Sequence, residues 1–237
     1  MITTLLIDDE PLARQELASL LTHYPDIRVL AQCANAVEGI AAIHQHKPDL
    51  VFLDISMPKI SGMEMLAMLD PDNLPKVVFV TAYDEYAVKA FENNAFDYLL
   101  KPIETERLEK CLERVRRAQG PQDLSPMVPE QLSLIPCYSG TLLKVLKVEN
   151  VEYAYSDLGG VHVASADEVI HTQLTLKVLE SRTPLLRCHR QYLIHPAAIA
   201  EIELQEGGNG EIHTQGGATL PVSRRYLKAL KQTLGFQ

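Results

Sequence analysis

The chain has 237 residues, 46% of them hydrophobic and 22% charged, which is typical of a globular protein with one large or two small domains. Its net charge of −9 argues against a protein that coats nucleic acid generally, although a small basic surface remains compatible with it. We expect a cytoplasmic protein without a membrane anchor, because no apolar run approaches ~18 residues, residues 1–5 show no signal-peptide pattern, and the four cysteines lack disulfide or zinc-site spacing.

The first half of the chain predicts strands that alternate with helices. We expect strands at residues 4–7, 28–31, 50–53, 77–80 and 98–100, and helices at 11–21, 35–46, 63–69, 84–93 and 104–117. Asn35 is the expected cap of the second helix. Such alternation is typical of an α/β fold in which a parallel sheet is joined by right-handed crossovers. The continuous apolar run 50–53 indicates a central strand, buried on both faces.

Polar groups follow four of these strands: Asp8 and Asp9, Asp54, Thr81 and Lys101. In a doubly wound sheet of order 2-1-3-4-5, the strands that end at Asp9 and Asp54 are neighbours, ~4.8 Å apart. Carboxylates crowded there repel each other unless a cation lies between them, and Mg²⁺ suits oxygen ligands of this kind. A metal-neutralised phosphoryl group is open to attack by a carboxylate, and a lysine and a hydroxyl can bind its oxygens.

Each of these residues also has a simpler structural explanation. Asp8 and Asp9 would serve as helix caps, and Asp54 as a solvated aspartate that starts a turn. Lys101 and Thr81 would be ordinary strand-end residues, and Tyr98 a half-buried packing residue. A rival chemistry, that of dehalogenase-type phosphatases, places a second aspartate two positions after the nucleophile. That position is Ser56 here, which argues against the rival.

Together, these residues resemble a known domain. Asp8-Asp9, Asp54-x-x-Met57-Pro58, Thr81-Ala82 and Tyr98-x-x-Lys101-Pro102 resemble the receiver domain of two-component response regulators, over about residues 1–118. The resemblance implies phosphoryl transfer from a sensor histidine kinase to Asp54, with Lys101 and Thr81 as catalytic partners. It implies Mg²⁺ on Asp9, Asp54 and the Ser56 carbonyl, with Asp8 acting through water. Thr81 and Tyr98 would form the switch.

A proline-containing stretch interrupts the pattern at residues 119–133 and indicates a semi-extended linker between two domains. Alternatively, residues 124–134 pack on one domain as an ordered arm.

The second half, residues 134–237, predicts a mainly β domain. We expect strands at 141–146, 151–155, 161–164, 185–189, 199–204, 211–214 and 218–221, a short helix at 173–181, and a last helix capped by Ser223. The run 207–211 partly resembles a nucleotide-cyclase signature, but it lacks the aspartate of that signature. Its glycines indicate a turn. No Walker loop, HExxH motif or nucleophile elbow is present, so we do not expect an enzyme.

The basic residues of this half gather at Arg190 and near the C-terminus, at Arg224, Arg225, Lys228 and Lys231. Arginine can grip guanine bidentately, and both basic side chains neutralise phosphate. Lys228 and Lys231 have the alternative of simply solvating the last helix. Residues 187–195 and 220–226 resemble the LytTR DNA-binding domain, over about residues 134–235. That resemblance implies a ten-stranded β fold that inserts loops into the major grooves of a direct-repeat site. Arg190, Arg224, Arg225 and Lys228 are its candidate contacts, with the segment from Ser156 to His162 as a third contact.

The whole chain therefore resembles a LytTR-family response regulator, most similar to the BtsR type. The resemblance implies a transcription factor that dimerises when phosphorylated and binds promoter DNA, with residues 83–91 as the dimer face. Two other functions stay open from the residues alone: a β domain that docks onto a protein, and a free-standing phosphatase.

Overall fold

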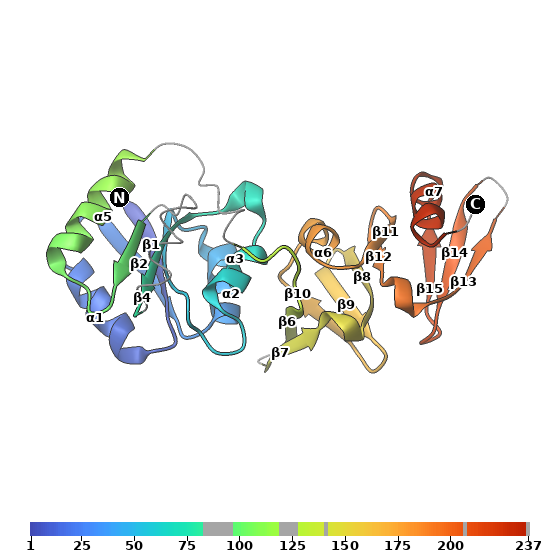
Figure 1. Ribbon diagram of the computed structural model, residues 1–237, viewed down its shortest axis with the longest axis horizontal. Coiled ribbons are helices and arrows are strands. Elements are labelled where there is room, and N and C mark those ends of the chain that lie inside the picture. Colours follow the sequence, from blue (N-terminus) through green and yellow to red (C-terminus); the bar gives the residue numbers. More distant parts are fainter. Residues whose placement is uncertain (83–96, 119–127, 140–141, 206–207, 236–237) are drawn as a thin grey trace. The chain divides into compact units, whose positions relative to one another are not determined.

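The protein is described here from a computed structural model, which covers residues 1–82, 97–118, 128–139, 142–205 and 208–235. The helix predicted at 84–93 and the dimer face predicted at 83–91 lie outside these residues. The chain forms two compact units, Met1–Glu130 and Gln131–Gln237 (Figure 1). Of the helices that the structure describes, none combines the length and the apolar character that crossing a membrane requires.

The N-terminal unit is a parallel five-stranded sheet with helices on both faces. Its strand order is β2-β1-β3-β4-β5, which confirms the predicted α/β class and strand order. In Figure 1, α1 and α5 cover one face of the sheet, and α2 and α3 cover the other. The strands are β1 (Ile2–Ile7), β2 (Ile27–Cys33), β3 (Leu50–Asp54), β4 (Lys76–Thr81) and β5 (Asp97–Leu100), and the helices are α1 (Pro11–Leu21), α2 (Ala36–His46), α3 (Gly62–Ala67) and α5 (Thr105–Arg117), with a 3₁₀ turn, η1 (Pro71–Asn73).

Strand β3 is the buried centre of this sheet. All five of its residues are buried, and Leu50 and Phe52 pack into a cluster with Leu108 and Leu112 of α5. Burial of one large apolar side chain contributes roughly 1.5–3 kcal/mol. The strand is therefore held firmly, and so is the carboxylate of Asp54 at its end.

Two helices begin where local caps direct them. Asn35 accepts a hydrogen bond from the backbone N–H of Glu38, which confirms the predicted cap of α2. Ser61 and Glu64 form a capping box that starts α3 at Gly62. A Cβ atom at Gly62 would lie only 2.3 Å from the backbone oxygen of Asp54. Glycine therefore allows α3 to start against the end of β3.

The C-terminal unit is mainly β, as predicted. Its described residues form ten antiparallel strands in two sheets, one ordered β11-β12-β8-β9-β10-β6-β7 and one ordered β13-β14-β15. The strands are β6 (Leu134–Ser139), β7 (Leu142–Lys147), β8 (Val151–Asp157), β9 (Gly160–Ser165), β10 (Val169–Thr172), β11 (Leu186–His189), β12 (Tyr192–Ile194), β13 (Ile199–Leu204), β14 (Gly210–Thr214) and β15 (Thr219–Val222), and the helices are α6 (Leu176–Arg182) and α7 (Arg224–Thr233), with 3₁₀ turns η2 (Val148–Asn150) and η3 (Pro196–Ala198).

Three of these strands, β6, β10 and β12, were not among the predicted elements. Strands β10 and β12 are three or four residues long, and each is held between two neighbours. Strand β6 contains Pro136, which cannot donate to a ladder. The carbonyl of Pro136 accepts a hydrogen bond from the hydroxyl of Thr172 on β10, so the side of Pro136 that lacks an N–H faces this short strand and not β7.

The predicted cap of the last helix is wrong. Ser223 occupies the position before α7, but its side chain makes no capping hydrogen bond. Instead, the side-chain oxygen of Asn209 accepts the N–H of Arg224 at 3.1 Å. A residue in the loop between β13 and β14 thus caps α7.

The described end of the predicted linker, residues 128–133, is not simply solvated. Leu132 is buried, and its N–H donates to the carbonyl of Arg182 at the end of α6. At Leu132, the chain is therefore packed on the C-terminal unit, while the bounds of the linker stay a prediction.

A row of aromatic rings crosses the larger sheet on the face opposite Ala154, Val163 and Leu193. Its members are cross-strand partners, so each ring lies beside the next. The tightest contact is the stack of Tyr155 on His162, with ring centroids 5.0 Å apart. The row comprises Tyr138, His171, His162, Tyr155, Tyr192 and His189.

The four cysteines are all free and buried, so their reactivity tests the packing of the two cores. Burial raises the pKa of the Cys33 thiol to about 11 and that of the Cys188 thiol to about 12. We expect no rapid reaction with a disulfide reagent at pH 8, because little thiolate is present and the buried sulfur atoms are inaccessible to the reagent. Absorbance should report four reactive thiols only after denaturation. Rapid reaction of the native protein with the reagent would contradict this packing.

Replacing Gly62 with alanine should destabilise the N-terminal unit by about 1–3 kcal/mol, because the new methyl group meets rigid backbone at the end of β3. The matched control is Gly39→Ala, whose added methyl group meets only the side chains of Ile7 and Met65. Urea unfolding followed by circular dichroism measures both. Equal midpoints for the two variants would show that the contact at Gly62 is not restrictive.

Candidate functional site

The acidic site lies at the carboxyl end of β1 and β3, which pair in parallel. Asp8 and Asp9 directly follow β1, and Asp54 is the last residue of β3. The carboxylate oxygens of Asp8, Asp9 and Asp54 lie within 4.8 Å of one another. The sheet therefore brings together the three carboxylates that the sequence placed there.

Lys101 reaches this cluster from the residue that follows β5. Its Nζ lies 2.8 Å from Asp8 Oδ2 and 3.3 Å from Asp54 Oδ2. The three side chains are largely buried, with 14%, 8% and 6% exposed for Lys101, Asp8 and Asp54. Attraction between these opposite charges is screened less here than at the surface.

Burial and charge shift two pKa values in the cluster. Burial raises the pKa of Asp8, and the nearby Asp54 adds to this, so that the hydrogen bond from Lys101 only partly offsets the shift. Burial disfavours the charged form of Lys101, but hydrogen bonds to Asp8 and Glu10 and attraction to Asp54 outweigh it and raise the pKa of Lys101. The lysine therefore stays charged, while the crowded carboxylates gain from any further cation.

Two residues that the sequence analysis did not single out complete the site. Glu10, whose side chain is 64% exposed, places Oε2 3.0 Å from Lys101 Nζ. The guanidinium of Arg14 on α1 donates to the carbonyl of Asp8. Glu10 follows Asp8-Asp9 directly in the sequence, so its position was a signal, whereas the contact of Arg14 depends on the start of α1.

The remaining predicted residues lie around this cluster in different ways. The backbone N–H of Ser56, an exposed residue, donates to Asp54 Oδ1 at 3.2 Å. Thr81 is fully buried at the end of β4, and its carbonyl accepts the N–H of Lys101. Tyr98 is half-buried on β5, with the guanidinium carbon of Arg107 5.8 Å from its ring centre.

Arg107 is anchored by a buried acid, Asp97. The guanidinium of Arg107 pairs with Asp97 and also donates to the carbonyl of Tyr98 at 2.8 Å. Arg114 adds a second ion pair to Asp97 at 3.4 Å. The start of β5 is thus tied to α5, which fixes the backbone on which Tyr98 lies.

In the C-terminal unit, hydrogen bonds join the three predicted DNA-contact segments. The N–H of Ser156 donates to the carbonyl of Gln191, whose side-chain amide donates back to the Ser156 carbonyl. The N–H of Ser223 donates to the carbonyl of Cys188 at 3.0 Å. The first connection reaches the β11–β12 turn, which carries Arg190, and the second reaches β11 two residues before that turn.

The basic side chains on this surface are open to solvent. Arg190, Arg224, Arg225 and Lys228 are all exposed. Arg225 places its guanidinium carbon 5.4 Å from the ring centre of Tyr226. The start of α7 and the β11–β12 hairpin therefore present positive charge from two segments that are hydrogen-bonded to each other.

The third segment differs in detail from the predicted loop. Strands β8 and β9 leave only Leu158 and Gly159 as the turn, so that Ser156 and His162 lie within strands. His162 pairs with Asp157, with Nε2 and Oδ1 3.1 Å apart. Leu158, which the sequence analysis passed over, is fully exposed at the tip.

Comparison with known proteins matches both units. Residues 4–113 match the family model described as the response regulator receiver domain, and residues 142–235 match the LytTr DNA-binding domain. An uncharacterized response regulatory protein of Shewanella oneidensis is 60% identical over 100% of both chains. A similar protein of Vibrio cholerae is 55% identical, again over 100% of both.

A named relative extends this comparison. The transcriptional regulatory protein BtsR of Escherichia coli K12 is 52% identical over 99% of this chain and 100% of the relative. These matches span the receiver, the LytTR domain and the residues between them. The chain therefore belongs to the family of response regulators that combine a receiver domain with a LytTR DNA-binding domain, and it is of the BtsR type.

Proposed function

We propose that a sensor histidine kinase phosphorylates Asp54, and that this modification promotes dimerisation and binding of the LytTR domain to direct-repeat promoter DNA in the cytoplasm. One observation carries the proposal. The nearly buried Asp54 carboxylate lies beside those of Asp8 and Asp9, all within 4.8 Å, and its Oδ2 lies 3.3 Å from the ammonium group of Lys101. Carboxylate nucleophile, acidic cluster and fixed positive charge are the groups that phosphoryl transfer to an aspartate requires.

The donor set of the acidic site fits Mg²⁺, because three carboxylates within 4.8 Å offer the hard oxygen ligands that this ion prefers. We assign Asp9, Asp54 and the Ser56 carbonyl as ligands, with Asp8 acting through water. When bound, the ion neutralises negative charge on the phosphoryl group.

The residues of the chain supply the other parts of the reaction. An Asp54 oxygen attacks phosphorus, its new P–O bond forms as the P–N bond of the kinase phosphohistidine breaks, and the imidazole leaves with the electron pair. Lys101 exchanges part of its contact with Asp54 for a phosphoryl oxygen. The Thr81 hydroxyl donates to another phosphoryl oxygen.

The phosphoryl group adds about −1.5 to −2 charges at the end of β3, and this is the physical cause of the switch. Thr81 is joined to β5 because its carbonyl accepts the N–H of Lys101. A shift of Thr81 toward the phosphoryl group therefore acts on the strand that carries Tyr98. We propose that Tyr98 turns inward in response and that residues 83–91 form the dimer face.

Dimerisation raises DNA affinity by holding two LytTR domains together, since the second domain then binds at a high effective concentration. Within each domain, we propose that Arg190 and Arg225 approach bases or nearby phosphates and that Arg224 and Lys228 contact phosphates. The hydrogen bonds from Gln191 to Ser156 and from Ser223 to Cys188 support a single surface built from three segments.

Replacing Asp54 with asparagine should abolish labelling by radioactive acetyl phosphate in the presence of Mg²⁺, because the amide is a poor nucleophile. The matched control is Asp49→Asn, which changes an aspartate just before β3, where it accepts hydrogen bonds from Thr3. That variant should label as the wild type does. Label that persists in Asp54→Asn would exclude Asp54 as the acceptor.

Replacing Arg225 with alanine should weaken promoter binding about tenfold and reduce the slope of log K against log salt by about 1. Lys147→Ala serves as a control, because Lys147 is an exposed base of the same unit that pairs with Glu149. Fluorescence anisotropy at several salt concentrations gives both quantities. An unchanged affinity and slope would place Arg225 outside the interface.

A further inference from the structure

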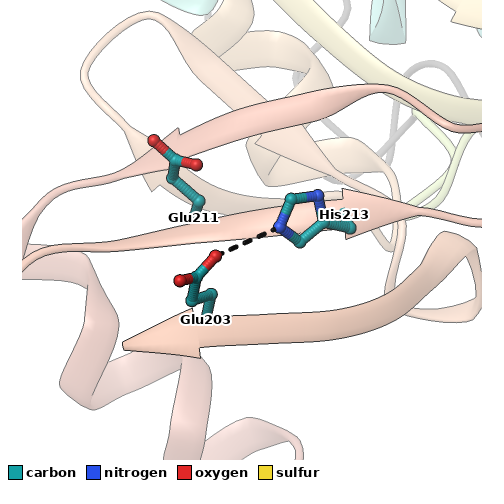
Figure 2. Close-up of side chains that lie close together, drawn as sticks. All are labelled: Glu203, Glu211 and His213. Carbon is teal, nitrogen blue, oxygen red and sulfur yellow. Dashed lines mark ion pairs between the residues drawn. The ribbon is translucent and has the colours of Figure 1, made fainter. Parts of the chain in front are cut away.

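We propose that Glu203, Glu211 and His213 form a binding site for one divalent transition-type metal ion, best matched by Zn²⁺. The site lies on one face of the three-stranded sheet of the LytTR domain (Figure 2). One carboxylate oxygen from each glutamate and one imidazole nitrogen lie within 4.8 Å of one another.

The strand register places these three side chains on one face. Glu203 of β13 is directly opposite Glu211 of β14, and His213 follows Glu211 by two residues. The alternate residues Ile212 and Leu220 are buried in the core with Leu230 of α7. The donors therefore stand on a sheet whose other face is packed, which limits the movement of their backbone.

Repulsion between Glu203 and Glu211 destabilises the sheet when no cation lies between them. Like charges directly opposite each other on adjacent strands are destabilising. Glu201, opposite His213, adds a third carboxylate to the same face. A divalent ion between Glu203 and Glu211 would convert their repulsion into attraction.

The imidazole distinguishes this group from an ordinary cluster of acids. His213 Nε2 lies 3.6 Å from Glu203 Oε2, and a dashed line marks this ion pair in Figure 2. The Nδ1 atom of His213 lies 3.2 Å from the hydroxyl oxygen of Thr219 on β15. We assign the proton to Nδ1, which donates to Thr219 and leaves the Nε2 lone pair facing the carboxylates. A second hydrogen bond of this kind orients most histidines that bind metal.

The donors select the type of metal. One imidazole nitrogen with two carboxylates suits Zn²⁺, whereas a site of oxygens alone, such as that of Asp8, Asp9 and Asp54, suits Mg²⁺. Bonds of about 2.0–2.2 Å to a tetrahedral Zn²⁺ place ligand atoms about 3.4 Å apart. The Nε2–Oε2 distance of 3.6 Å is close to this, and the 65% exposed side chain of Glu203 is free to adjust. Water would complete the coordination.

The site lies beside the loop that caps α7. Glu203 and Glu211 form the pair of residues next to the last pair of this ladder, Leu204 and Gly210. Beyond it, the N–H of Gln205 donates to the carbonyl of Asn209, whose side chain caps α7. A bound ion would hold together the end of the hairpin from which this cap extends.

Competition with a zinc-binding dye tests the site in the full-length protein, with excess Mg²⁺ present to occupy the receiver. The wild type should bind one more Zn²⁺ than Glu211→Gln and His213→Gln, and Thr219→Val should bind that ion about tenfold more weakly. Glu201→Gln, which removes a carboxylate from the same face, should match the wild type. Equal stoichiometry in all variants, or equal loss in Glu201→Gln, would overturn the assignment.

A second measurement needs no variant that might fold differently. In nuclear magnetic resonance spectra of the wild type, Zn²⁺ should shift the Nε2 resonance of His213 while Mg²⁺ leaves it unchanged. A ring protonated on both nitrogens that shows no response to Zn²⁺ would show that His213 serves only as an ion-pair partner of Glu203, and the proposal would fail.

Discussion

The attraction between the Lys101 ammonium group and the carboxylates around it is the interaction on which the receiver depends. Parallel pairing of β1 with β3 brings Asp8 and Asp54 to one edge of the sheet, where they repel each other. Lys101 contacts both and also Glu10, so a single positive charge joins residues that follow or end β1, β3 and β5. Any group that binds there must compete with or complement this arrangement, and the proposed Mg²⁺ ion and phosphoryl group would do so with opposite charges.

The LytTR domain depends instead on hydrogen bonds between its segments. The β11–β12 hairpin is joined to β8 through Gln191 in its turn, and to the start of α7 through the hydrogen bond from Ser223 to Cys188 of β11. The exposed arginines thus lie on segments that are held together by hydrogen bonds. A basic surface can therefore exist in a chain whose net charge is −9, because a few basic side chains gather on adjacent segments of one domain.

Much of the receiver could be predicted from sequence, because its strands carry their own apolar runs and end in the residues that define the site. Leu50–Asp54 is the clearest case, since both its burial and its terminal carboxylate were expected. The LytTR domain was less predictable. Strands β10 and β12 are short, and each pairs on one side with a strand distant in the sequence, β6 and β8 respectively. Helix α7 is capped by Asn209, 15 residues before Arg224. Contacts of this kind leave no local pattern, and the same holds for the contact between Arg14 and Asp8.

The aromatic row across the larger sheet has a consequence for how this protein can be observed. The chain has nine tyrosines and no tryptophan. Tyr153, Tyr155 and Tyr192 stack closely, with ring centroids 5.7–6.2 Å apart, whereas Tyr24 and Tyr98 belong to the other unit. Electronic transitions of rings at this spacing couple, so the near-ultraviolet dichroism of the chain should be dominated by the DNA-binding domain. The molecule thus contains an intrinsic optical reporter of one domain, with no label attached.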